Sequence, residues 1–139
     1  MLTETDARQK SPLALAFFGD AVYETLVREY LTEQSDAAPR TLHRLTVCVV
    51  CARAQSEALK LLEGYLTTEE QAVAKRGLNA SKAAVPRSAT PKSYRAATAL
   101  EALFGYLAMT GQAERIRRLF NIISKTQIDE ELKAAHRVI

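Results

Sequence analysis

Two acidic side chains interrupt helical faces that are otherwise apolar, and they are the first candidates for chemistry. On a helical projection Asp20 lies in the middle of an apolar stripe, with Glu24 one turn later. The stripe around Asp20 consists of Leu13, Phe17, Ala21, Val27 and Leu31. Glu101 occupies a similar position in a later segment. The face around Glu101 consists of Tyr94, Ala97, Thr98, Phe104, Gly105 and Ala108.

The chemistry that suits two such acids is the binding of a hard divalent cation. An unpaired carboxylate in an apolar setting must find a cation or take up a proton, because burying its charge is unfavourable. If the two helices pack together, Asp20 and Glu101 can converge on Mg²⁺, which binds a few carboxylate oxygens and retains water. The same pattern also fits acids that form ion pairs at a helix end or lie at the edge of the stripe.

Helices must position these acids, and the composition of the chain is typical of helices throughout. Hydrophobic residues make up 47% of the 139 residues, whereas the chain has only 5 Gly and 4 Pro. We predict an all-α fold in a single domain over 1–139, with a helical core at about 12–137. Caps and breakers place helices at 13–31, 41–63, 67–76 and 93–109, with one or two more across 113–136. Gly64 and Gly77 are predicted to end the second and third helices.

The connection at about 78–92 lacks helical periodicity and is predicted to be an exposed basic loop. It contains two prolines together with Lys82, Arg87 and Lys92. The formal net charge is only +3. The placement of the cations, rather than their sum, therefore indicates a face that binds phosphate.

The chain offers little support for a zinc site or a membrane segment. Cys48 and Cys51 form a C-x-x-C pattern, but they are the only cysteines, and there are only two histidines. We therefore predict packed thiols, because structural zinc needs four ligands. No segment approaches the roughly 20 apolar residues of a membrane span, and 1–10 does not resemble a secretory signal. We expect a cytoplasmic protein that does not contact membranes.

Two segments resemble the signatures of the ribonuclease III family. Residues 15–24, LAFFGDAVYE, resemble the signature around the first catalytic acid, and residues 100–107, LEALFGYL, resemble the second signature. Further segments narrow the resemblance to the Mini-ribonuclease III branch, which lacks a separate domain for binding double-stranded RNA. These segments are Leu42-His43, Ala52-x-x-Gln55-Ser56, Lys75-Arg76-Gly77-x-Asn79-Ala80 and Tyr94-Arg95.

The resemblance implies an endoribonuclease that hydrolyses phosphodiester bonds in double-stranded RNA as a homodimer and requires Mg²⁺. It implies that Asp20 and Glu101 are the catalytic acids and the metal ligands, and that the substrate is precursor 23S ribosomal RNA. Phosphates and sugar hydroxyls of A-form RNA would be contacted by Arg76, Asn79, Lys82, Arg87, Lys92 and Arg95.

Two further residues are expected near the site. Thr98 and Ala16 stand where full-length ribonuclease III enzymes have additional acids, a loss that the Mini branch shares. Glu24 can support the metal through a water molecule, or it can form an ordinary ion pair with Arg28 at i+4.

Two other functions remain open at this stage. The chain can be a catalytically silent RNA-binding or ribosome-associated protein of the same fold, or a helical protein-interaction module whose acids are surface charges. Cation-dependent cleavage of duplex RNA separates these possibilities. The enzyme cuts, the silent protein only binds, and the interaction module does neither.

Overall fold

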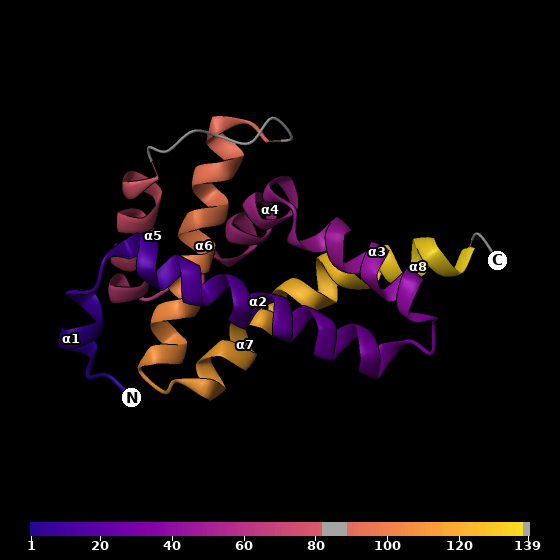
Figure 1. Ribbon diagram of the computed structural model, residues 1–139, viewed down its shortest axis with the longest axis horizontal. Coiled ribbons are helices and arrows are strands. Elements are labelled where there is room, and N and C mark those ends of the chain that lie inside the picture. The colour runs from indigo at the N-terminus through magenta and orange to yellow at the C-terminus, as the bar shows by residue number, and fades with distance from the viewer. Residues whose placement is uncertain (82–88, 138–139) are drawn as a thin grey trace.

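The computed structural model describes residues 1–81 and 89–137, and all regular secondary structure in these ranges is helical, which confirms the all-α prediction. The helices are α1 (Glu4–Arg8), α2 (Pro12–Gln34), α3 (Pro39–Val50), α4 (Ala52–Leu62), α5 (Thr68–Ala80), α6 (Pro91–Met109), α7 (Ala113–Ile123), the π-helical turn η1 (Ser124–Ile128) and α8 (Asp129–Arg137). Long helix α2 lies across upright helix α6 (Figure 1). No helix in the described ranges is long and apolar enough to cross a membrane.

Two glycines allow the backbones of α2 and α6 to touch where they cross. Gly19 of α2 faces the Glu101 carbonyl of α6, and Gly105 of α6 faces the Leu15 carbonyl of α2. A Cβ atom at either glycine would overlap the facing carbonyl oxygen, so no other residue fits there without separating the helices. The crossing also places Asp20, the neighbour of Gly19, next to the helix that carries Glu101.

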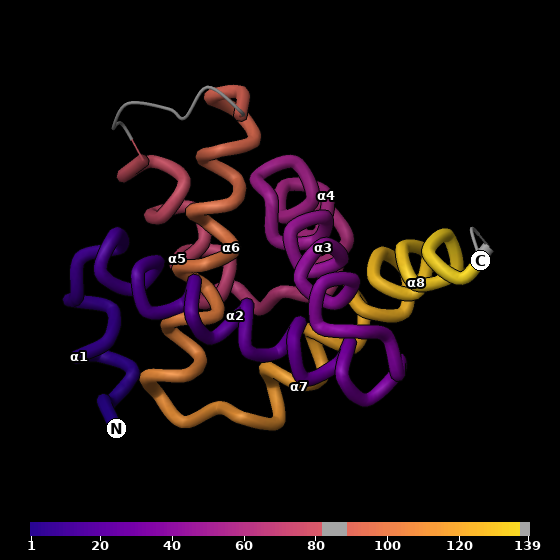
Figure 2. The backbone as a smooth tube through the Cα atoms, turned by 45° about the vertical axis from the view of Figure 1, so that its right-hand side comes forward, coloured from indigo at the N-terminus to yellow at the C-terminus, as the bar shows by residue number. Residues whose placement is uncertain are grey.

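The core surrounds α6, which is buried on almost every side. Helices α1 and α5 pack on one side of α6 and α4 packs on the other (Figure 2). The Tyr23 ring packs edge-on against Phe104 and Phe120, at centroid distances of 5.2 and 5.9 Å. Helices α2, α6 and α7 are therefore joined by a single aromatic cluster.

The prediction of a single helix over 41–63 is wrong, because the helix is interrupted at Cys51. Helix α3 ends at Val50, and Cys51 adopts an extended conformation (φ −67°, ψ 159°) before α4 begins. Val49 and Val50 are β-branched and weak helix formers, so the break falls where helix propensity is low. The break redirects α4, whose buried side then packs against α6.

The prediction that Gly77 ends the third helix is also wrong. Gly77 is buried inside α5, where an added Cβ would lie 2.9 Å from Ala102 Cβ and 3.1 Å from Ala99 Cα. Its small size serves the packing of α5 against α6. Helix α5 continues to Ala80 and α6 begins at Pro91, so the helices extend further into 78–92 than predicted.

A partly buried ion pair fixes the start of α5 to α7. Arg115 donates from Nε and Nη2 to the carboxylate of Glu70, at 2.8 and 2.7 Å, and from Nη2 to the Tyr65 carbonyl at 2.6 Å. Burial raises the pKa of Glu70, but hydrogen bonds from Arg115 and Thr67 outweigh burial and lower the pKa below its ordinary value. Glu70 is therefore a structural acid, distinct from the two candidates for chemistry.

Candidate active site

Asp20 is an exposed residue of α2, and the predicted apolar stripe around it is wrong. The buried side of α2 consists of Leu15, Ala16, Gly19, Tyr23, Val27 and Leu31. Leu13, Phe17 and Ala21 are exposed instead. Apolar residues occur on two sides of α2, and helical spacing alone does not show which side is covered. Asp20 lies beside the buried side and is accessible to a ligand.

Glu101 is the partly buried member of the pair. Burial raises the pKa of Glu101, and the adjacent Asp20 carboxyl raises it as well through hydrogen bonding and charge repulsion, so that the pKa is about 8 instead of its ordinary 4.5. The nearby side chain of Gln55 acts in the opposite direction and lowers the pKa of Glu101. The predicted convergence of Asp20 and Glu101 therefore occurs in the described structure, at the crossing of α2 and α6.

The residues at this crossing fit a divalent cation that keeps part of its water shell. Mg²⁺ binds through one or two carboxylates together with water and substrate phosphates, so two acids suffice. Without a cation, burial and then the neighbouring Asp20 carboxyl disfavour the charged form of Glu101 and raise its pKa. Among the described residues no group of three or more His, Cys, Asp and Glu side chains is placed to hold a metal, which excludes a zinc-type cluster only for those residues.

Glu24 and Thr98, the two secondary residues, have hydrogen-bond partners of their own. Glu24 accepts from Arg28 Nε at 3.0 Å, so the i+4 ion pair is present. Thr98 is buried, and its hydroxyl donates to the Tyr94 carbonyl at 3.0 Å and lies 3.3 Å from the Ser81 hydroxyl. Both side chains are thus engaged in protein contacts in this state.

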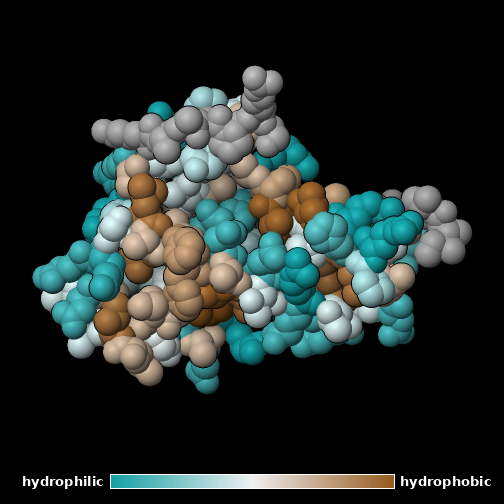
Figure 3. All heavy atoms as spheres, viewed as in Figure 1, coloured by the Kyte–Doolittle hydropathy of each residue, from teal (hydrophilic) through white to brown (hydrophobic). Residues whose placement is uncertain are grey.

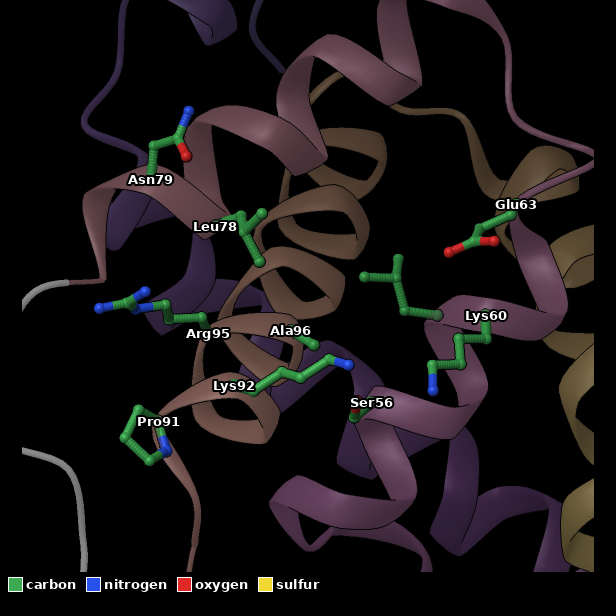
Figure 4. Close-up of a pocket in the computed structure, with 10 residues that line it drawn as sticks. Ser56, Lys60, Glu63, Leu78, Asn79, Pro91, Lys92, Arg95 and Ala96 are labelled. Carbon is green, nitrogen blue, oxygen red and sulfur yellow. The ribbon is translucent and has the colours of Figure 1, made fainter.

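A groove of about 770 Å³ between α4, α5 and α6 holds three of the predicted RNA contacts, Asn79, Lys92 and Arg95. Neither acid lines this groove. The side chains of Lys92 and Lys60 extend towards each other across it, whereas Arg95 points the other way (Figure 4). The groove is therefore a cationic surface separate from the acid pair.

Arg76, another predicted RNA contact, does not line this groove. Arg76 donates from both terminal nitrogens to backbone carbonyls, those of Arg8 and Lys10, and so fastens α5 to the α1–α2 connection. Lys82 and Arg87 lie outside the described residues.

Sequence reasoning assigned no role to two residues that the structure places at these sites. Gln55 lies on the buried side of α4 together with Ala54 and Ala58. A single polar residue among apolar residues at helical spacing is only a weak signal for a buried polar contact. Lys60 faces the groove, but nothing in the sequence separates it from other surface lysines.

A family model for the ribonuclease III domain matches residues 13–112. The matched span contains both acids and both crossing glycines. The chain belongs to the ribonuclease III family. As a member of this family it is an endoribonuclease, and the family acts on double-stranded RNA, generally with a divalent metal.

Several relatives of this ribonuclease III chain are named Mini-ribonuclease 3. The protein of Enterococcus faecalis is 42% identical over 118 residues, which cover 84% of this chain and 89% of the relative. The protein of Symbiobacterium thermophilum is 48% identical over 105 residues, which cover 76% and 81%. A crystal structure of a Fusobacterium nucleatum protein superimposes with a TM-score of 0.79 at 36% identity, covering 86% of this chain and 96% of that one. The resemblance to the Mini branch is thereby confirmed.

Proposed function

We propose that the chain hydrolyses double-stranded RNA with Mg²⁺ held by Asp20 and Glu101. The observation that carries this proposal is the apposition of the two carboxyls at the α2–α6 crossing, where the pKa of Glu101 is raised to about 8. An acid pair of this kind is stabilised when a cation replaces the shared proton.

The metal and the two acids would have different roles in the reaction. Bound Mg²⁺ would supply Lewis acidity for activating water and for stabilising charge on the departing 3′ oxygen. Asp20 and Glu101 provide two ionised oxygen donors at a spacing that the glycine crossing sets. Glu101 must release its proton when the metal binds, so metal affinity should rise with pH.

The groove between α4 and α6 is the proposed contact for RNA phosphates. Lys60 and Lys92 bring cations to it from two helices, Arg95 also lines it, and Asn79 adds an amide that can reach a sugar hydroxyl. Arg76, Lys82 and Arg87 remain predicted contacts. Since A-form RNA is recognised through its shape and backbone, such a surface would bind duplexes of many sequences.

The proposed active form is a homodimer with one acid pair in each protomer, so that the two RNA strands are cut separately. An apolar surface supports it: Phe17 is 84% exposed, and Leu13 and Phe18 beside it are 47% and 41% exposed. Apolar side chains gather over the N-terminal half of α2 (Figure 3). The resemblance to the Mini branch extends the proposal to precursor 23S ribosomal RNA as substrate and to the cytoplasm as compartment.

The test is cleavage of an end-labelled RNA duplex in Mg²⁺ and in EDTA. We expect EDTA, Asp20→Asn and Glu101→Gln each to reduce the rate by more than about 100-fold, because residues that merely support a metal ligand already account for 10- to 100-fold. Glu33→Gln, at an exposed acid near the end of α2, is the matched control and should cut normally. Binding without cleavage by the wild type would favour the silent RNA-binding protein, and neither binding nor cleavage would favour the interaction module.

A further inference from the structure

Gln55 on α4 is a buried polar residue to which the proposed chemistry assigns no role. Gln55 is 2% exposed, and its Oε1 atom has no hydrogen-bond partner. A buried acceptor without a partner is rare and calls for an explanation. In the described structure the Tyr23 and Tyr106 hydroxyls and Gln127 Oε1 are also buried without a partner. The other buried polar side chains have partners, and these are Thr46, Glu70, Ser81, Thr98 and Ser124.

The contact that Gln55 does make is with the proposed metal site. Helix α4 packs against α6, and the Gln55 side chain lies close enough to the Glu101 carboxyl to lower its pKa. Only an amide N–H of Gln55 can donate to a carboxylate and act in this direction. Helix α4 thus reaches across to α6 at the position of the acid. The extended conformation of Cys51 starts α4 in the direction that makes this contact possible.

The chemistry of an amide suits the support of a metal ligand. A carboxylate oriented by a donor keeps its remaining lone pairs for a cation, and such outer hydrogen bonds hold ligands in place. A lysine or arginine in the same position would compete with the cation by charge, whereas a glutamine is neutral. The unpartnered Oε1 adds an oxygen that can accept a hydrogen bond from a water on the cation.

We propose that Gln55 is a positioning residue, which orients the Glu101 carboxylate for the metal through its amide N–H. This inference rests on the proposed function, since it assumes that Glu101 is a ligand. Gln55 acts through Glu101 and touches neither RNA nor the reacting phosphate. It adds α4 to the elements that build the site, beside α2 and α6.

The test compares Gln55→Met with Gln127→Met. Methionine keeps most of the side-chain volume and removes the amide. Gln127 is a matched control, because it also packs against α4, donates to the Ala54 carbonyl at 2.7 Å and has a buried unpartnered Oε1 atom. For each variant we would measure Mn²⁺ binding without RNA by electron paramagnetic resonance, the Mg²⁺ concentration that half-activates cleavage, kcat, KM for the duplex and the melting temperature.

For Gln55→Met we expect weaker Mn²⁺ binding and a higher half-activating Mg²⁺ concentration, each by about 10- to 100-fold, with KM for RNA unchanged. Gln127→Met should change the melting temperature without changing the metal dependence. Wild-type metal binding in Gln55→Met, or an equal loss in both variants, would overturn the role of Gln55 alone. A wild-type protein that binds no Mn²⁺ would overturn the proposed function together with this inference.

Discussion

Glu101 lies half-buried beside a second acid, an arrangement that disfavours its charged form in the metal-free protein. Burial is the larger cause of its raised pKa, and the carboxyl of Asp20 is the second. A carboxyl retained in such a place is more typical of a binding site than of a structural ion pair. Glu70 is more deeply buried than Glu101, but its pKa is lowered because Arg115 hydrogen-bonds to it.

The raised pKa of Glu101 predicts how the stability of the metal-free protein depends on pH. The folded protein keeps a proton that the unfolded chain releases, so the favourable contribution of Glu101 is complete below about pH 4.5 and is lost as the pH rises through about 8. In EDTA the melting temperature should therefore fall across this range by more in the wild type than in Glu101→Gln. Calorimetry at several pH values measures the difference, with Glu33→Gln as control. Parallel curves for wild type and Glu101→Gln would contradict the prediction.

Sequence reasoning found the acids but not their surroundings. The apolar neighbours of Asp20 and Glu101 marked both acids as unusual, and the family signatures assigned them a role. The covered face of α2 could not be predicted, because apolar residues occur on two sides of that helix. Gln55 could not be given a role either, since its contact with Glu101 depends on the direction of α4.

At the scale of elements, local signals predicted helices well where capping and periodicity agree. Helix α2 carries its proline at the start, and α5 begins with a capping box at Thr67 and Glu70. The predictions failed where tertiary packing overrides local preference. Gly77 is helical because α6 packs closely against it, and α1 forms in a polar segment because Thr3 caps it and Ala7 is buried.

The crossing of α2 and α6 predicts a large effect of a single methyl group. Gly19→Ala would place a Cβ atom against the Glu101 carbonyl and 2.8 Å from the Gly105 nitrogen, so the helices must separate. We expect a loss of about 3 kcal/mol or more in the free energy of unfolding, at the upper end for overpacking. Gly64→Ala, where an added Cβ meets nothing, is the matched control and should change stability little. Urea unfolding measures both, and equal effects would contradict the tight crossing.

At the scale of the whole molecule, different surfaces suit different partners. The N-terminal half of α2 exposes apolar side chains that suit a second copy of the chain, whereas the α4–α6 groove presents cations that suit a polyanion. The net charge of +3 did not predict the cationic groove, because it is a sum over the whole chain. The exposed aromatic residues could not be identified by composition, because Phe17 and the buried Tyr23 belong to the same apolar helix.

The apolar surface of α2 predicts that one charged substitution controls self-association. Phe17→Glu should convert a dimer to monomers, because a carboxylate would be desolvated at the interface. Tyr65→Glu, at an exposed aromatic residue at 59% exposure in the α4–α5 connection, is the matched control and should leave the dimer intact. Sedimentation velocity at several protein concentrations measures the outcome. A wild-type monomer, or a Phe17→Glu dimer, would contradict the assignment of this surface.

The backbone contact at Gly19 and Gly105 also bears on protein engineering. The spacing of the two acids depends on main-chain atoms that touch without intervening side chains, whereas α7 packs onto the same core through side chains such as Leu119 and Ile123. Side chains can be exchanged for others of similar volume, but the main-chain contact cannot. A heat-resistant version of this nuclease should be obtainable by repacking α7 and α8 while every residue at the crossing is left unchanged.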